Sequence, residues 1–173
     1  MNLPIERINA LSPYKVSLKE NGSLCFRTLS GSVYEVGFIE DYTFMDENAY
    51  QFFILELEGK HSAKDELVKQ TIWVIIETFF SENNPIVLYI CDMSDGKQAI
   101  RNRLFSIWYY EYENKNNFTF LSTKIEVEDT DYYASIIIKN SNPQIEEIRN
   151  SFEEFIKELK GKLSKNEKNV MRK

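Results

Sequence analysis

Residues 86–91 constrain the fold of this chain more than any other segment. Their sequence, I-V-L-Y-I-C, is a continuous apolar run that is too short to form the core of a helix. Runs of this kind are typical of a β-strand that is buried on both faces. We therefore expect a central buried strand at this point of the chain.

The first third of the chain predicts an antiparallel meander. Tyr14, Val16 and Leu18 alternate with polar residues, which is the period of a half-buried strand. Asn21-Gly22 follows, and this dipeptide between two alternating runs is the strongest short signal for a β-hairpin. We expect four strands joined by short connections, at residues 14–18, 24–28, 34–38 and 50–58.

Three helices are expected in the rest of the chain, at residues 65–80, 97–112 and 142–163. The first follows a capping residue, Ser62 or Asp65, and the last begins at Asn142-Pro143. Acidic residues gather early in the last helix and lysines gather late, which matches the direction of the helix dipole.

The middle helix carries apolar side chains at helical spacing, and we expect this side to face the core. The residues concerned are Ile100, Leu104, Ile107 and Trp108. Two further strands are expected at residues 118–127 and 132–139. The predicted fold class is α+β: a mostly antiparallel sheet, made of the N-terminal meander and the central buried strand, with three packed helices.

Charge is distributed unevenly along the chain, whose net charge is −6 at pH 7. Residues 157–173 contain seven Lys or Arg and two Glu, so this end carries +5 and the remaining residues carry −11. An acidic body argues against broad contact with the phosphate backbone of a nucleic acid. We expect a single α+β domain at residues 1–163 and a frayed basic tail at residues 164–173.

Composition also points to a cytoplasmic protein without a membrane segment. No apolar stretch reaches the ~20 residues that a membrane-spanning helix needs, and the N-terminus lacks the pattern of a secretory signal. Cys25 and Cys91 lie in predicted strands, where free thiols pack as small hydrophobic groups. Two cysteines and one histidine argue against a structural zinc site, and no cofactor is predicted.

A polar cluster follows the central strand and is the best candidate site in the chain. Asp92, Ser94 and Asp95 come directly after the apolar run, and the next helix carries Arg101 and Arg103. Ligands of open sheets tend to bind beyond the carboxyl end of a strand that is followed by a helix. These five residues are therefore the predicted ligand-binding candidates.

Each candidate also has a purely structural interpretation. Asp95 with Gln98 fits a capping box at the start of the helix, and Asp92 is expected to bond to backbone or to pair with an arginine. Arg101 and Arg103 point about 200° apart on a regular helix, so they cannot both face one ligand. A structural ion pair is the expected role for one of them.

Four segments together resemble a family of small uncharacterised bacterial proteins. These segments are F-R-T-x-x-G-x-x-Y-x-V-x-F (26–38), T-I-x-x-I-I-x-x-F-F (71–80), Y-I-C-D-x-S-D-G-x-Q-x-x-R-x-R-L-F (89–105) and the closing Asn-Pro helix. The resemblance covers nearly the whole chain. It implies a cytosolic single-domain protein and no particular activity, because the family has no assigned function.

Three functions remain open from the sequence. The leading hypothesis is a non-enzymatic intracellular domain that binds another protein or itself. The sequence shows no complete catalytic set, while Trp73, the aromatic residues at 108–112 and the long terminal helix offer surplus apolar surface. The first alternative is a divalent-metal enzyme that acts on nucleic acid or nucleotides through Asp92 and Asp95, with Glu35 or Glu77 completing the site. The second alternative is a small-ligand sensor with Asp92, Ser94 and an arginine in its pocket.

Overall fold

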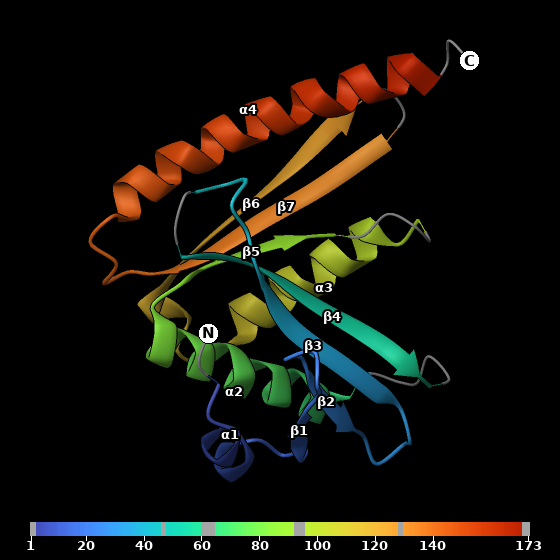
Figure 1. Ribbon diagram of the computed structural model, residues 1–173, viewed down its shortest axis with the longest axis vertical. Coiled ribbons are helices and arrows are strands. Elements are labelled where there is room, and N and C mark those ends of the chain that lie inside the picture. Colours follow the sequence, from blue (N-terminus) through green and yellow to red (C-terminus); the bar gives the residue numbers. More distant parts are fainter. Residues whose placement is uncertain (1–2, 46–47, 60–64, 92–95, 128–129, 171–173) are drawn as a thin grey trace. The chain divides into compact units, whose positions relative to one another are not determined.

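The computed structural model describes residues 3–45, 48–59, 65–91, 96–127 and 130–170, together with side chains up to residue 163. These residues form seven β-strands and four α-helices (Figure 1). Strands pair antiparallel within each part of the fold, so the predicted α+β class with a mostly antiparallel sheet is confirmed. The helix count differs from the prediction, because α1 (Ile5–Leu11) was not expected.

The chain divides into two compact units. The first contains residues 1–40 and 50–85, and the second contains residues 41–49 and 86–173. The second unit therefore includes a short segment, residues 41–49, that lies between two stretches of the first unit in the sequence.

The first unit contains the predicted meander. Its strands are β1 (Val16–Leu18), β2 (Leu24–Arg27), β3 (Val33–Glu40) and β4 (Ala49–Glu58), which pair in sequence order. The predicted turn at Asn21-Gly22 is confirmed, since Gly22 has a φ of 82° and its N–H donates to the Lys19 carbonyl at 3.0 Å. Gly37 is required for a different reason: a Cβ there would lie 2.6 Å from ring atoms of Phe53.

Helix α2 (Glu66–Asn83) packs on one face of this meander. Asp65 is one of the two predicted capping residues. It caps the helix by accepting a hydrogen bond from the Leu67 N–H at 2.9 Å. Near the other end, the Phe79 ring lies 3.8 Å from the Phe38 ring, centre to centre, and 5.0 Å from that of Tyr50. Aromatic side chains therefore contact the strands near the C-terminal end of α2.

Helix α1 was missed because its sequence signal is short. The helix has seven residues, and Ile8 is its buried side chain. One buried residue in two turns gives no helical period that could be distinguished from an irregular segment. Its anchoring to β1 depends instead on Asn9, whose side chain accepts from the Val16 N–H at 2.7 Å and donates to the Val16 carbonyl at 2.9 Å.

The second unit is a three-stranded antiparallel sheet in the order β5-β7-β6. Its strands are β5 (Ile86–Ile90), β6 (Phe118–Val127) and β7 (Thr130–Lys139). A short 3-10 helix, Lys115–Asn117, precedes β6. Residues 86–89 of β5 are all buried, so the predicted strand buried on both faces is confirmed.

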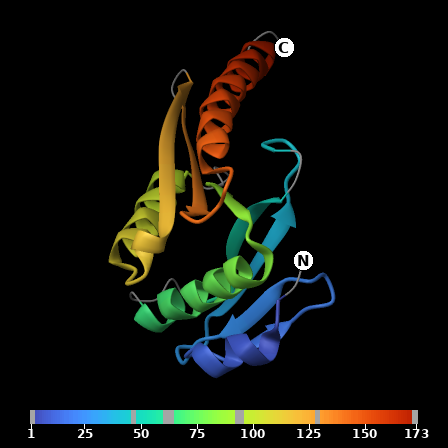
Figure 2. The same cartoon turned by 90° about the vertical axis from the view of Figure 1, so that its left-hand side faces the viewer.

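Two helices cover opposite faces of this sheet, as Figure 2 shows. Helix α3 (Gln98–Glu111) contacts one face through Phe105, whose ring lies 4.5 Å from that of Tyr89. Helix α4 (Ile145–Val170) contacts the other face, where Ile148 and Phe152 join a core with Leu88. Successive strand residues point to opposite faces of the sheet. Leu88 therefore packs on the face covered by α4, and Tyr89 packs on the face covered by α3.

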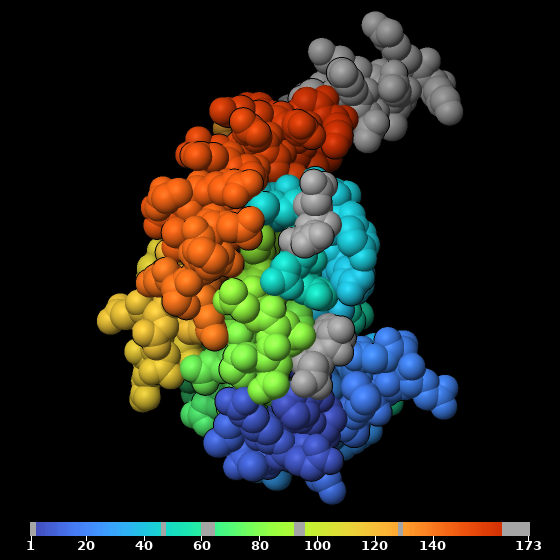
Figure 3. All heavy atoms as spheres, turned by 60° about the vertical axis from the view of Figure 1, so that its left-hand side comes forward, coloured from blue at the N-terminus to red at the C-terminus, as the bar shows by residue number. Residues whose placement is uncertain are grey.

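The segment 41–49 completes the core beneath α4. The Phe44 ring lies 6.1 Å from the Phe152 ring in an edge-to-face arrangement, and Met45 packs against the same core. Figure 3 shows α4 as a ridge on the surface of this unit, with the segment 41–45 beside it. The unit therefore needs this inserted segment for its packing.

Helix α4 begins as predicted and ends later than expected. The Asn142 side chain accepts from the Gln144 N–H at 2.9 Å, which is the expected capping contact. The backbone remains helical to Val170, beyond the predicted end at Leu163. Within the described residues, no helix combines the length and the hydrophobicity that a membrane span requires.

Candidate functional site

The predicted site begins where β5 ends. Asp92, Ser94 and Asp95 lie outside the described residues, so their placement as ligands or caps stays a prediction. The residues on both sides of them are described. Cys91 directly follows the last residue of β5, and its N–H donates to the Tyr133 carbonyl of β7 at 3.1 Å.

Cys91 and Tyr89 are buried and protonated at neutral pH. Burial raises the pKa of the Cys91 thiol to about 11, although a hydrogen bond with Tyr89 and the charge of Arg101 act in the opposite direction. Burial also raises the pKa of the Tyr89 hydroxyl. A thiol in this state is a poor nucleophile, because the thiolate is the reactive form.

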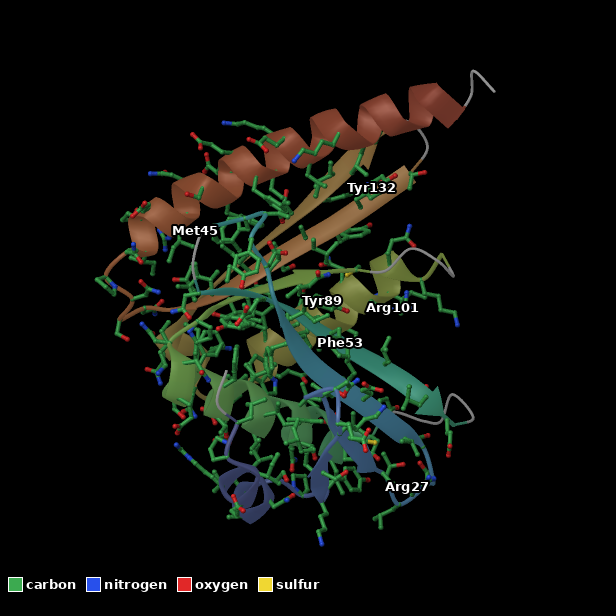
Figure 4. The ribbon with its side chains drawn as sticks, viewed as in Figure 1. Arg27, Met45, Phe53, Tyr89, Arg101 and Tyr132 are labelled. Carbon is green, nitrogen blue, oxygen red and sulfur yellow. The ribbon has the colours of Figure 1, made fainter. Side chains whose placement is uncertain are left out.

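The structure brings one of the two predicted arginines to this strand end. Arg101 is half-buried and its charge acts on both Tyr89 and Cys91; Figure 4 labels Tyr89 and Arg101. Arg103 is exposed on the opposite side of α3. The two guanidinium groups therefore lie on different sides of α3.

The start of α3 lies close to the end of the predicted polar cluster. The helix begins at Gln98 with Lys97 as its cap residue, and the Lys97 side chain makes no capping hydrogen bond. Gln98 is thus the first helical residue, and its side-chain N–H donates to the Asp131 carbonyl at 3.2 Å. The predicted capping box pairs Gln98 with Asp95, which lies outside the described residues, so that interpretation stays a prediction.

The inner face of α3 is aromatic. The Phe105 ring packs against the Tyr89 ring at a tilt, and the Tyr109 ring lies 4.6 Å from the Phe120 ring of β6. The Tyr109 hydroxyl also donates to the Phe118 carbonyl at 2.9 Å. These contacts fix which side of the helix faces the sheet.

The outer face of α3 carries three of the four side chains that we expected in the core, whereas the fourth, Trp108, is half-buried. Ile100 is 66% exposed, Leu104 41% and Ile107 37%. The predicted orientation is therefore wrong. The helix has two apolar sides, and the larger rings of Phe105 and Tyr109 remove more surface from water when they face the sheet.

We call Ile100, Leu104 and Ile107 the outer stripe of α3. The three residues are spaced by four and then by three positions, which is the spacing of a coiled-coil seam. Arg103 and Tyr110, both exposed, lie beside the stripe. Arginine and tyrosine are enriched at protein interfaces, so the surroundings of the stripe also fit a binding surface.

Glu35 is a buried carboxylate in the first unit, and its hydrogen-bond network was not predicted from the sequence. It accepts hydrogen bonds from Lys19 Nζ at 2.7 Å, Ser23 Oγ at 2.6 Å and Asn21 Nδ2 at 3.1 Å. The hydrogen bonds from Lys19, Ser23 and Asn21 lower the pKa of Glu35 to about 2. The signal for this role was the polar turn at residues 19–23, which supplies all three donors.

This network predicts that acid weakens the first unit through Glu35. The folded-state pKa lies below the ordinary value of 4.5, so the stabilisation is complete above that value and is lost as the pH falls toward 2. We expect the difference in unfolding free energy between the wild type and Glu35→Gln to shrink between about pH 6 and about pH 2.5. Urea unfolding at several pH values measures this difference.

Glu58→Gln is the matched control for this titration. Glu58 pairs with Arg27 at 3.2 Å on the exposed side of the same strands, where ion pairs contribute little. Its effect should be small at every pH. A Glu35→Gln effect that stays constant down to pH 2.5 would show that the ionised carboxylate does not stabilise the fold.

Among the described residues, no group of three or more His, Cys, Asp or Glu could hold a metal ion.

Comparison with known proteins places the chain in a family. No curated protein matches the sequence. The model of one protein family matches residues 64–154, which is just over half of the chain and includes the outer stripe. The chain therefore belongs to the family of unknown function DUF6169.

Proposed function

We propose that this chain is a non-enzymatic protein-binding domain whose binding surface is the outer stripe of α3. The observation that carries the proposal is the exposure of Ile100, Leu104 and Ile107 on one side of a helix. Their spacing fits the apolar face of another helix, so the occupant is an amphipathic helix of a partner protein.

The size of the stripe sets the expected strength of binding. Full burial of an aliphatic side chain contributes roughly 1.5–3 kcal/mol, so three of them contribute several kcal/mol. Association costs an estimated 4–15 kcal/mol in lost translational and rotational freedom. The stripe therefore supports a weak, reversible complex, to which Arg103 and Tyr110 add contacts at the rim.

The protonated thiol of Cys91 and the hydrogen-bonded carboxylate of Glu35 support a binding role over a catalytic one. Cys91 carries a neutral thiol at physiological pH, and Glu35 is hydrogen-bonded to three side chains of its own unit. Both cysteines are free thiols, which suits the reducing cytoplasm in which we propose that the chain acts.

Site-specific photocrosslinking in cells that express the full chain tests this proposal. A photoreactive phenylalanine analogue replaces Tyr110, which is exposed beside the stripe. We expect a discrete covalent adduct that disappears when Leu104→Glu is added and persists with Leu29→Glu. Leu29 is an exposed leucine in a turn of the first unit, so it controls for the added charge.

The same analogue at Tyr42, an exposed tyrosine of the segment 41–49, controls for random collision. The proposal fails if Tyr110 gives no adduct beyond the Tyr42 background. It also fails if the adduct is insensitive to Leu104→Glu, because the stripe would then not hold the partner.

A further inference from the structure

The outer edge of β6 carries backbone groups that the fold leaves open. β6 is the last strand in the order β5-β7-β6, so only one of its edges is paired. Directly before the strand, the Asn117 carbonyl accepts from the Asn140 N–H at 2.9 Å. Residues of an antiparallel ladder alternate in direction, so the odd-numbered residues of β6 bond to β7. The N–H and C=O groups of residues 120, 122, 124 and 126 therefore point outward, in the plane of the sheet.

The contact at the start of β6 agrees with this alternation. The carbonyl of Phe118, another even-numbered residue, accepts a hydrogen bond from the Tyr109 hydroxyl of α3 at 2.9 Å and is not used by β7. Within the described part of the chain, no hydrogen bond reaches the outward backbone groups of residues 120, 122, 124 and 126. We call these groups the open edge of β6. Each of the four residues offers one donor and one acceptor.

The edge strand of the first unit is closed by a side chain instead. Strand β1 has three residues, and Asn9 bonds to both the N–H and the carbonyl of Val16, at 2.7 and 2.9 Å. The side-chain amide thus takes the place of a neighbouring strand. β6 has ten residues, no proline and an unbroken register with β7, and only charged side chains protect its edge. A long edge of this kind is a template for an added strand.

We propose that the open edge of β6 binds an extended segment of a partner protein, which adds a fourth strand to the sheet of the second unit. An extended chain places a donor and an acceptor at every second residue, about 6.8 Å apart, along one edge. A helix cannot match this row, because its backbone groups are bonded internally. The inference goes beyond the proposed function and is independent of it, since the outer stripe lies on α3.

The side chains of β6 determine the pattern of the added strand. The odd-numbered residues lie on the face covered by α4, where Leu121 packs against the core. The even-numbered residues lie on the other face, where Ser122, Lys124 and Glu126 are exposed. Residues of the added strand that bond to the open edge share this second face, so they should be polar. The residues between them lie beside Leu121 and should be apolar.

Charge favours basic residues at the polar positions. Lys124 pairs with Glu126 at 2.7 Å and with Asp131 at 3.0 Å. One ammonium and two carboxylates leave this group with a net charge of −1, on a chain whose residues 1–156 carry −11. A basic side chain opposite Glu126 in the added strand balances that charge. The expected segment therefore alternates apolar residues with polar and basic ones.

A second copy of β6 fits the open edge poorly. In the two-fold antiparallel register that pairs all four outward residues, Glu126 lies opposite Phe120 and no charge is balanced. A shift of one position in each copy places Lys124 opposite Lys124, which is unfavourable. The register that pairs Lys124 with Glu126 leaves residues 120 and 122 beyond the end of the other strand, at Val127. The occupant is therefore a segment of different sequence.

Amide exchange in the purified full chain, followed by NMR, tests the inference. The probe is the peptide acetyl-RVTVRVT-amide, in which valine alternates with arginine or threonine. In the free protein, the N–H groups of the open edge should exchange rapidly, and those of residues 121, 123 and 125 slowly. For a dissociation constant on the order of 1 mM, about 4 mM peptide should slow exchange at the open edge about fivefold. Unchanged exchange overturns the inference.

Two N-methylated forms of the peptide are matched controls. Methylation of the arginine and threonine nitrogens removes the N–H groups that face β6, so this form should give no protection. Methylation of the valine nitrogens alters only the far edge of the added strand, and protection should remain within about twofold. Equal protection by the two forms would show that the backbone does not bind, which overturns the inference.

Two substitutions of Lys124 test the same point on the protein. Lys124→Pro removes an outward donor without breaking a bond to β7, and it should weaken binding about tenfold. Lys124→Thr removes the same charge but keeps the donor, so binding should stay within about twofold of the wild type. Circular dichroism checks that both variants are folded. Equally tight binding by the two would contradict the proposed hydrogen bonds.

Further outcomes identify a wrong occupant or a wrong surface. Protection of the open edge without peptide, increasing with protein concentration, would mean that a second copy occupies it, and the inference would be overturned. Leu104→Glu should leave the effect of the peptide unchanged. If it abolishes the effect, the peptide binds the outer stripe and the inference is overturned. The photocrosslinking experiment at Tyr110 decides the proposed function separately, because it depends on Leu104 and not on Lys124.

Discussion

Replacement of Phe79 by alanine should lower the free energy of unfolding by about 3–5 kcal/mol. Phe79 is fully buried in α2, where its ring stacks on Phe38 and meets the edge of Tyr50. Removal of the ring leaves a cavity and also removes two aromatic contacts, each of which contributes beyond the buried area. Urea unfolding followed by circular dichroism measures the loss.

Phe79→Leu is the control for this substitution, because it retains most of the volume. It should cost about 1 kcal/mol. A loss below 1 kcal/mol for Phe79→Ala would show that α2 does not depend on this contact with the strands. Such a result would contradict the packing described for the first unit.

Phe152→Ala should produce a loss of similar size, about 3–5 kcal/mol, in the second unit. Phe152 is buried in α4, and its ring lies against Phe44 in the core that also contains Ile148. The adjacent exposed residue provides the control: Glu153→Ala should change stability by no more than about 0.5 kcal/mol. Equal losses for the two variants would show that α4 is not held by this ring.

Comparison of Phe79→Ala with Phe152→Ala also tests the expected single domain. If the whole chain unfolds cooperatively, both substitutions should shift the same transition, whichever part of the spectrum is followed. Two separate transitions, each sensitive to one of the substitutions, would show that the units unfold independently.

Much of the fold could be predicted from local patterns, because local physics determines those elements. Asn21-Gly22 specifies its turn through the backbone freedom of glycine, and Asp65 caps α2 through its own carboxylate. The run at residues 86–91 predicted a strand buried on both faces, and the two covering helices explain why it contains no charged residue.

The orientation of α3 could not be predicted, because the helix has apolar residues on two sides. The spacing of Ile100, Leu104 and Ile107 is as regular as that of Phe105 and Tyr109. The choice between them depends on the facing sheet, where Tyr89 and Phe120 provide ring partners for the aromatic side. Those partners lie far away in the sequence, so no local period contains that information.

The insertion of residues 41–49 into the second unit has a consequence for how this protein can be divided. Neither unit corresponds to one continuous stretch of sequence, so neither could move between genes as a single exchangeable module. A fragment cut at the limits of the family match, residues 64–154, would keep α2 without the four strands of its own unit. It would also lack Phe44 and its neighbours beneath α4. Such a fragment would expose two apolar surfaces at once and would aggregate.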